Sequence, residues 1–317
     1  MLRIGLVGMG GISGAHIGAW LQIPEAKIIC VCDIRPENAN AAAEWSGGKA
    51  YLEFDEMLSN EKIDVLDICL PTYLHADFAV EALEKGIHVL VEKPISLKKE
   101  DIERVYGAAQ KNNKNVMVAQ VLRFWREYEA LKEAYDSGKY GKLLSGHMVR
   151  LGSKPKWSWD NWMADPSRSG LVPFDLHIHD LDFMIYAFGT PENLICHRNV
   201  NDSQDYINAI YEFKNFFVTA EASWFDCNYR FQSGYRFQFE KAVMEYTGGV
   251  LTIYHQNGET ETLEEEQGNK NGINLPKSNA YFNEIRYFTD CVLSGNPCDM
   301  VKPQELKTVL ELIDRLN

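Results

Sequence analysis

A carboxylate and an imidazole stand four residues apart, at Asp175 and His179, in a stretch whose apolar residues recur with a helical period. Residues four apart on a helix lie on one face, so we expect these two side chains to be neighbours. A carboxylate beside an imidazole fixes its tautomer and stabilises its protonated form, as a general base for an alcohol requires. The pair therefore predicts acid/base chemistry on a hydroxyl group.

The same stretch leaves two other interpretations open, because it also contains His177 and further acids. On a strand His177 and His179 would point the same way and could share a metal ion, whereas on a helix they are about 200° apart. The helical period therefore counts against a metal site, and we expect none. A plain surface helix start, where acids are favoured by the helix dipole, is the remaining alternative.

A lysine follows directly after an apolar run, in Glu92-Lys93-Pro94. The run at 88–91 is typical of a buried strand, and ligands of parallel sheets bind at the carboxyl ends of the strands. An amine at that place could hydrogen-bond or exchange a proton with a substrate hydroxyl. An ion pair between the neighbours Glu92 and Lys93 in a loop is the plain alternative.

A glycine-rich loop, Gly8-Met9-Gly10-Gly11-Ile12-Ser13-Gly14, lies between an apolar run at 3–7 and a helical stretch. A second apolar run, at 28–32, ends at Asp33. Strand, glycine turn, helix, strand and acid in this order are the dinucleotide-binding fingerprint. Gly8 would allow the tight turn, and Gly10 would let the backbone approach a pyrophosphate. The loop therefore predicts a bound dinucleotide.

The acid at position 33 bears on the choice of cofactor. Its carboxylate could accept hydrogen bonds from both ribose hydroxyls and would repel a 2′-phosphate, which favours NAD. Arg35 could pair with such a phosphate, so NADP stays possible. A further strand, 65–70, ends at Pro71-Thr72-Tyr73-Leu74-His75, where the nicotinamide half would lie. The predicted cofactor-binding residues are Gly8, Gly10, Gly11, Ile12, Asp33, Arg35, Leu70, Pro71, Thr72, His75, Glu92 and Lys93.

The elements that would position these residues alternate between strands and helices up to residue 121. Helices are predicted at 36–45, 76–85 and 98–112, the last capped by Ser96, and strands at 51–54, 65–70, 88–91 and 116–121. This alternation predicts an α/β fold, with an N-terminal Rossmann domain built on a doubly wound parallel sheet. We expect residues 1–121 to form the NAD(P)-binding domain.

The pattern changes near residue 122. A helix at 126–135 precedes long β-rich segments at 143–151, 206–213, 216–224, 235–246 and 249–255. Hairpins at 214–215 and 247–248 make the sheet mainly antiparallel, and helices at 281–293 and 303–316 follow. Residues 122–317 are therefore predicted to form a second, α/β domain.

The bulk composition limits the partners. A formal charge of −13 without a lysine- or arginine-rich run makes nucleic acid an unexpected partner. No apolar stretch approaches the ~18 residues of a membrane span, and a first strand at Leu2 leaves no room for a signal peptide. Seven cysteines without a C-x-x-C pair are typical of a reducing compartment, so we expect a cytoplasmic protein. Cys30 and Cys32 are interpreted as core residues, not as a metal pair.

Taken together, these motifs resemble the Gfo/Idh/MocA family, named for glucose–fructose oxidoreductase, inositol 2-dehydrogenase and a rhizopine-catabolism oxidoreductase. The resemblance covers nearly the whole chain, most strongly 1–125 and 168–190, and includes the glycine loop, His75, Glu92-Lys93-Pro94 and the pair Asp175 and His179. It implies hydride transfer between NAD(P) and a hydroxyl-bearing carbon of a sugar, inositol or related polyol. It also implies a large open sheet in the second domain, which commonly forms the interface of a homodimer or homotetramer.

The resemblance further implies roles for single residues. His179 would be the acid/base, Asp175 would orient it and bind substrate, and Lys93 would polarise the reacting oxygen. The segment 168–174 departs from the usual run of small residues, so the floor of the pocket is expected to differ. Arg123 and Trp162 are further substrate candidates.

Three tryptophans, Trp157, Trp159 and Trp162, precede the predicted helix. At least one of them is hypothesised to stack on a sugar ring, with packing between domains or subunits as the alternative.

Two other activities stay open for a chain that resembles this family. One is glycoside cleavage with tightly held NAD and no net redox change, and the other is a non-catalytic nucleotide sensor.

Overall fold

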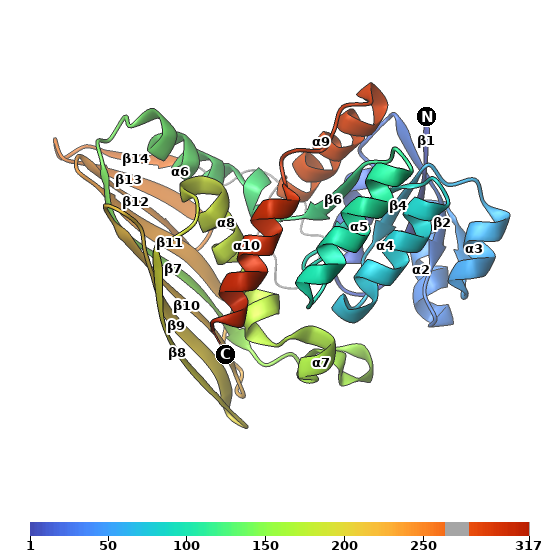
Figure 1. Ribbon diagram of the computed structural model, residues 1–317, viewed down its shortest axis with the longest axis horizontal. Helices are drawn as coiled ribbons and strands as arrows, with labels where there is room; N and C mark the ends of the chain where they lie inside the picture. Colours follow the sequence, from blue (N-terminus) through green and yellow to red (C-terminus); the bar gives the residue numbers. More distant parts are fainter. Residues whose placement is uncertain (264–278, 317) are drawn as a thin grey trace. The chain divides into compact units, whose positions relative to one another are not determined.

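The computed structural model describes residues 1–263 and 279–316 (Figure 1). These residues divide into two compact units. The first contains residues 1–121 and 279–303, and the second contains residues 122–263 and 304–316. The units differ from the predicted contiguous ranges in one respect, because residues 279–303 belong with the first unit. A 3-10 turn, η2 (Val121–Phe124), contains the boundary along the chain.

The first unit is built on a six-stranded parallel sheet with the order β3-β2-β1-β4-β5-β6. This is a doubly wound topology, so the predicted Rossmann fold is confirmed. Every residue of strands β4 and β6 is buried, because helices cover both faces of the sheet. The strands are β1 (Leu2–Val7), β2 (Ala26–Cys32), β3 (Lys49–Tyr51), β4 (Val65–Ile68), β5 (His88–Glu92) and β6 (Val116–Ala119).

Six helices accompany this sheet: α1 (Ser13–Trp20), α2 (Pro36–Ser46), α3 (Phe54–Asn60), α4 (His75–Glu84), α5 (Lys99–Lys111) and α9 (Ala280–Ser294), with a 3-10 turn η1 (Thr72–Leu74) before α4. Two local predictions are wrong. The strand expected at 51–54 lies earlier, and Phe54 begins α3. Ser96 does not cap α5, because Lys98 occupies the N-cap while the Ser96 hydroxyl donates to Asp101.

The second unit contains an eight-stranded sheet with the order β14-β13-β12-β11-β7-β10-β9-β8. All neighbours are antiparallel except β7 and β10, so the mainly antiparallel prediction is confirmed. The strands are β7 (Leu143–Ser153), β8 (Asn193–Asn201), β9 (Gln204–Glu212), β10 (Phe217–Phe225), β11 (Gln232–Phe239), β12 (Ala242–Thr247), β13 (Val250–His255) and β14 (Thr260–Leu263).

Helices of the second unit lie along one face of this sheet (Figure 1). They are α6 (Arg126–Ser137), α8 (Ile178–Phe188) and α10 (Pro303–Asp314), the last in this unit from residue 304 on. Shorter segments are η3 (Trp159–Ala164), α7 (Pro166–Ser169) and the π-helical turn η4 (Pro173–His177). The core lies between helices and sheet, where the Tyr128 ring packs edge-on against Phe183 and Tyr235 at centroid distances of 4.8 and 5.2 Å.

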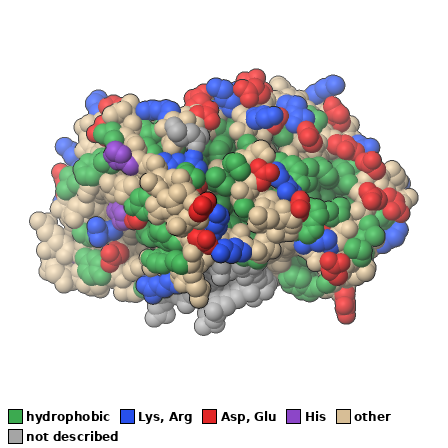
Figure 2. All heavy atoms as spheres, turned by 90° about the horizontal axis from the view of Figure 1, so that it is seen from below, with side chains coloured by type: hydrophobic (Ala, Val, Ile, Leu, Met, Phe, Trp, Pro, Cys, Tyr) green, Lys and Arg blue, Asp and Glu red, His purple; other side chains and the backbone are tan. Residues whose placement is uncertain are grey.

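The surface of the molecule carries charges of both signs. Acidic and basic side chains are interspersed on the face that Figure 2 draws, as expected for a chain without a basic run. Within residues 1–263 and 279–316, no helix has the length and apolar character needed to cross a membrane.

Candidate active site

The glycine loop joins β1 to α1, and two of its glycines serve different purposes. Gly8 has φ +89°, and a Cβ there would stand 2.6 Å from the backbone carbonyl of Cys69. Gly8 is therefore required both by the turn and by the close approach of the neighbouring strand's end. A Cβ on Gly10 would meet nothing within 4 Å. The loop is open at Gly10, and Gly11 and Ile12 are partly exposed, as access for a pyrophosphate requires.

Asp33 follows β2 and turns its carboxylate toward this loop. Oδ2 accepts the backbone N–H of Met9 at 2.8 Å, and Oδ1 accepts that of Arg35 at 2.8 Å. The Arg35 guanidinium also donates to both carboxylate oxygens, at 3.0 and 3.1 Å. The acid is thus held beside the loop, where a ribose would need it. Arg35 is bound to Asp33 in this arrangement and is not extended toward a phosphate.

The segment after β4 is linked to the segment after β5 by His75. Its Nδ1 lies 2.7 Å from the carbonyl oxygen of Pro94, and its Nε2 lies 2.6 Å from that of Leu70. Burial lowers the pKa of His75, and the neutral ring that this favours donates its single N–H to one of the two carbonyl oxygens at a time. The ring has almost no accessible surface, so the expected direct contact of His75 with a cofactor is not supported. Thr72 is buried too, whereas Leu70 and Pro71 are partly exposed.

Lys93 stands at the carboxyl end of β5 and is partly exposed, while its neighbour Glu92 is buried. One Glu92 oxygen accepts the backbone N–H of Lys93 at 3.0 Å, and the other lies 3.0 Å from Nε2 of His16. Both carboxylate oxygens of Glu92 are therefore engaged within the protein. The expected cofactor contact through this side chain is not supported, and Glu92 instead holds the strand end that presents Lys93.

In the second unit, Asp175 and His179 lie on one continuous helical segment. Asp175 belongs to the π turn η4, and His179 to the first turn of α8. The expected plain α-helix is thus corrected to a π turn followed by an α-helix, and π turns of this kind are frequent at functional sites. Both side chains are partly exposed, whereas His177 and Asp180 are fully buried. The entry to the turn is held by Asp205, which accepts the N–H of Val172 at 3.1 Å.

His177 is a core residue. Its Nε2 lies 2.6 Å from the hydroxyl of Tyr211, and burial lowers its pKa to about 3. The ring is therefore neutral near pH 7 and engaged with Tyr211, which removes the basis for a metal ion shared with His179. In the described residues, the groups that approach metal-ligand geometry are His16, Asp67 and Cys69 of the first unit.

The acids that follow His179 form buried ion pairs. Asp180 accepts from Arg150 at 2.8 Å, and Asp182 accepts from Arg123 at 2.6 and 2.8 Å. Arg123 also donates to Glu305 of α10 at 2.6 Å and is fully buried. Arg123 therefore ties α8 to α10, and the prediction that it contacts a substrate or cofactor is not supported.

The three tryptophans lie on the segment before α7. Trp157 and Trp159 are 58% and 42% exposed, and Trp162 is partly buried. All three keep accessible surface, so stacking of at least one of them on a sugar ring stays a prediction.

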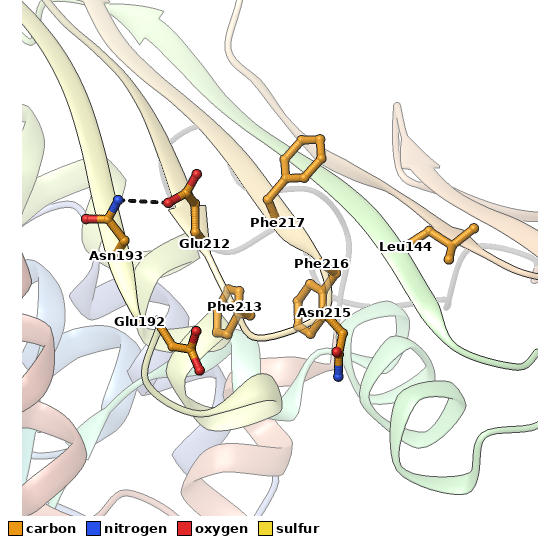
Figure 3. A pocket seen from close by; sticks show the side chains of 8 residues that line it. All are labelled: Leu144, Glu192, Asn193, Glu212, Phe213, Asn215, Phe216 and Phe217. Atoms are coloured by element: carbon orange, nitrogen blue, oxygen red, sulfur yellow. Dashed lines mark hydrogen bonds between the residues drawn. The ribbon is translucent and has the colours of Figure 1, made fainter.

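A surface pocket of about 500 Å³ lies at the hairpin between β9 and β10 (Figure 3). Its rings Phe213 and Phe216 are stacked with centroids 4.6 Å apart, and Asn193 donates to Glu212 at 2.7 Å. The lining residues are Leu144, Glu192, Asn193, Glu212, Phe213, Asn215, Phe216 and Phe217. The pocket contains no residue of the predicted site, so it adds nothing to the candidate chemistry.

Sequence reasoning missed His16 and Asp67. His16 lies in α1 among apolar neighbours, and Asp67 lies inside the apolar strand β4. Two ionisable residues in elements that must be buried need partners, because an unpaired buried charge is costly. This signal was present in the sequence, but it did not say which residues pair.

Family models match both halves of the chain. The model described as "Oxidoreductase family, NAD-binding Rossmann fold" matches residues 2–120, and the "GFO/IDH/MocA C-terminal domain" matches residues 128–245. The chain belongs to the Gfo/Idh/MocA oxidoreductase family. The resemblance noted in the sequence is thereby confirmed, and the first unit is the NAD-binding Rossmann part of a Gfo/Idh/MocA protein.

Relatives within the family carry different activities. A 2,7-anhydro-N-acetylneuraminate hydratase of Mediterraneibacter gnavus is 29% identical over 56% of this chain and 47% of the relative. A myo-inositol 2-dehydrogenase of Thermotoga maritima is 28% identical over 59% of this chain and 55% of the relative. The chain thus spans about half the length of these curated relatives.

A solved structure of levoglucosan dehydrogenase in complex with NADH and levoglucosan resembles the Gfo/Idh/MocA chain along its length. The TM-score is 0.85, with 99% of this chain and 96% of the other covered. The identity is 19%, so the likeness shows a common fold.

Proposed function

We propose that this Gfo/Idh/MocA protein is an NAD-dependent oxidoreductase acting on a hydroxyl-bearing carbon of a sugar, inositol or related polyol. The observation that carries the proposal is a contrast in exposure. Lys93, Asp175 and His179 keep accessible surface, whereas the ionisable residues next to them in sequence, Glu92, His177 and Asp180, are buried in pairs. Accessible ionisable groups among buried ones are those available to a substrate.

The residues of the first unit fit an NAD molecule. The open backbone at Gly10 suits a pyrophosphate, and the Asp33 carboxylate beside it suits ribose hydroxyls. Bound NAD supplies the hydride acceptor. Asp33 favours NAD over NADP, because a 2′-phosphate would lie against a carboxylate.

We assign three roles to this chain's own side chains. His179 accepts the proton of the substrate hydroxyl, and Asp175 orients its ring and binds substrate. The Lys93 amine donates to the reacting oxygen and stabilises the negative charge that develops there. The hydroxyl proton thus goes to Nε2 of His179, since Nδ1 of this ring is buried, while the carbon gives up its hydride.

The test is the absorbance of reduced nicotinamide after purified protein is mixed with NAD or NADP and a panel of inositols, aldoses, amino sugars and sugar acids. A rise with one polyol that is absent in Lys93→Ala supports the proposal. Product formed from an anhydro sugar or a glycoside without net NADH would instead assign the redox-neutral chemistry suggested by the hydratase relative. Binding of NAD with no turnover of any compound would assign a sensor.

We also infer that the Gfo/Idh/MocA chain forms a homodimer or homotetramer through the face of its eight-stranded sheet that the helices do not cover. One row of aligned residues across five strands keeps accessible surface, whereas the rows on either side of it are buried in β9, β10, β7 and β11. The residues of the accessible row are Ile195, Ile210, Thr219, His147 and Arg236. Exposed apolar residues on a broad sheet are suited to a second copy. Ile195→Lys should reduce the mass measured by light scattering, while Leu293→Lys on α9 should not.

A reducing, cytoplasmic setting is part of the same proposal. All seven cysteines are free thiols, and four of them are buried, at Cys30, Cys32, Cys69 and Cys291. The interspersed surface charges and the formal charge of −13 support a small-molecule substrate over nucleic acid or a membrane. Retention on heparin at physiological salt would contradict the proposal that the protein does not bind nucleic acid.

A further inference from the structure

A fully buried histidine of α1 joins two strands of the parallel sheet at the point where Lys93 emerges. We propose that His16 is a positioning residue for Lys93: it holds the Glu92 carboxylate, and that carboxylate holds the backbone of Lys93. The proposal rests on the role of Lys93 given above and names a second residue required for it.

The contacts form one continuous chain. Nδ1 of His16 lies 2.8 and 3.0 Å from the two oxygens of Asp67, and its Nε2 lies 3.0 Å from Oε1 of Glu92. The remaining oxygen of Glu92 accepts the N–H of Lys93 at 3.0 Å. Both nitrogens of the ring face carboxylates, and only the protonated imidazole can donate to both. Two charge-assisted bonds therefore fix the ring between β4 and β5.

The charges reinforce this geometry. Burial by itself lowers the pKa of His16, but the charge of Asp67 raises it well above the ordinary value. Burial by itself raises the pKa of Glu92, but the bond from His16 brings it below the ordinary value. His16 is thus a cation between two anions. Without that cation, Glu92 would be a buried charge next to Asp67 and would have to move or take up a proton.

Both of these responses of Glu92 change the environment of Lys93. If Glu92 moves, its bond to the Lys93 N–H is lost and the strand end is no longer held. If Glu92 takes up a proton, the acceptor of that N–H loses its charge. The effect on Lys93 is local because the same carboxylate makes both bonds.

A metal ion is the other occupant that this cluster suggests, since His16, Asp67 and Cys69 approach ligand geometry. The 2.8 Å between His16 Nδ1 and Asp67 is an ordinary hydrogen-bond length, so a shared proton accounts for it. The Cys69 thiol donates to Oδ1 of Asp67 at 3.8 Å, so a thiol proton accounts for that contact as well. We therefore interpret His16, Asp67 and Cys69 as a hydrogen-bonded cluster and not as a metal site.

The chain offers a matched control. Trp20, one turn further along α1, donates its indole N–H to Asp67 at 2.7 Å and not to Glu92. Trp20→Phe removes a buried hydrogen bond from the same cluster but leaves the link from His16 through Glu92 to Lys93. If His16 only stabilised the fold, Trp20→Phe and His16→Gln would have similar effects on Lys93. If His16 positions Lys93, only His16→Gln changes the reactivity of that amine.

The experiment measures the reactivity of the Lys93 amine and needs no substrate. The protein is acylated with trace acetic anhydride, and peptide mass spectrometry gives the rate at Lys93 relative to the exposed Lys98 and Lys99. We expect His16→Gln and Glu92→Gln to change this ratio about threefold or more, because a lysine amine responds to its local environment. Trp20→Phe should leave it unchanged.

With an active substrate in hand, the same two variants should lower kcat about tenfold or more at an unchanged Kd for NADH, because misplacement of a reacting group acts on turnover. Unchanged Lys93 reactivity in folded His16→Gln and Glu92→Gln would overturn the proposal. If His16→Gln does not fold, Glu92→Gln, which keeps the size and shape of the side chain, tests the proposal by itself. A changed Lys93 reactivity in a protein that oxidises no polyol would retain the positional link and refute the proposed function.

Discussion

The Arg35 guanidinium donates two hydrogen bonds to the Asp33 carboxylate, at 3.0 and 3.1 Å, so the acid proposed to favour NAD is already paired with a neighbouring cation. A ribose must share or displace these bonds, and a 2′-phosphate would face both the arginine and the acid. We therefore propose that the balance between these two side chains sets the choice between NAD and NADP.

Replacing the acid should shift that balance. We expect Asp33→Ala to weaken NADH binding about 10- to 100-fold, because hydrogen bonds to a charged group contribute about 1.5–3 kcal/mol. NADPH should lose less, since Arg35 is released to meet the phosphate. Fluorescence titration with both cofactors measures the two constants, with Arg35→Ala as control. An unchanged ratio of the two constants would refute this account of Asp33.

Removal of the Lys93 amine should act on turnover. Lys93→Ala is expected to lower kcat about 10²- to 10³-fold, the usual cost of losing a donor to a developing oxyanion. Lys98→Ala, on an exposed neighbour, should be neutral. Steady-state kinetics on the substrate found by the panel gives the comparison. A Lys93→Ala enzyme with full kcat would contradict the assignment.

Replacing Arg123 distinguishes a role in stability from a role in substrate binding. Arg123→Met leaves Asp182 and Glu305 without their cation and should cost about 3–5 kcal/mol in the free energy of unfolding. KM of the folded variant should stay within about twofold, because a fully buried side chain makes no substrate contact. Urea unfolding and steady-state kinetics measure the two effects. A raised KM with unchanged stability would restore the original prediction for Arg123.

His177 makes the stability depend on pH in a defined direction. Its folded pKa of about 3 lies below the unfolded value of about 6.5, so the unfolded chain binds the extra proton between these values. The free energy of unfolding should therefore fall as pH decreases below about 6.5, by up to about 1.4 kcal/mol per unit from this ring. His177→Gln should show a shallower fall in urea titrations between pH 6.5 and about 4.5. An identical slope in the variant would show that the ring does not contribute.

Trp162 tests the stacking hypothesis. If its ring lies on a sugar, Trp162→Ala should raise KM about two- to tenfold, from an aromatic contact of about 0.5–1.5 kcal/mol. Trp157→Ala and Trp159→Ala, on more exposed rings, are the matched comparisons. KM values unchanged in all three variants, with a reduced mass by light scattering, would assign the cluster to contact between copies.

Local patterns were enough to predict much of this protein. The glycine loop with Asp33 specified the β1–α1–β2 unit, because the turn, the helix start and the buried strand are each encoded by adjacent residues. The hairpin of β9 and β10 was predicted for the same reason, whereas the π turn that contains Asp175 was not. Strand β8 was missed because it alternates between exposed and partly exposed residues and carries no apolar face. The break at Glu240-Lys241, which separates β11 from β12, was hidden within one long β-rich segment.

Partnerships between distant residues were decided only by the tertiary structure. His16 meets an acid 51 residues away and another 76 away, and Arg123 meets Glu305 across 182 residues. No local period encodes such pairs, because they depend on which strands lie side by side and which helix covers them. The sequence by itself therefore determined the family, the fold class and the accessible residues with chemistry. Burial and long-range pairing decided that the polar atoms of His75, Glu92 and Arg123 are engaged with the protein itself.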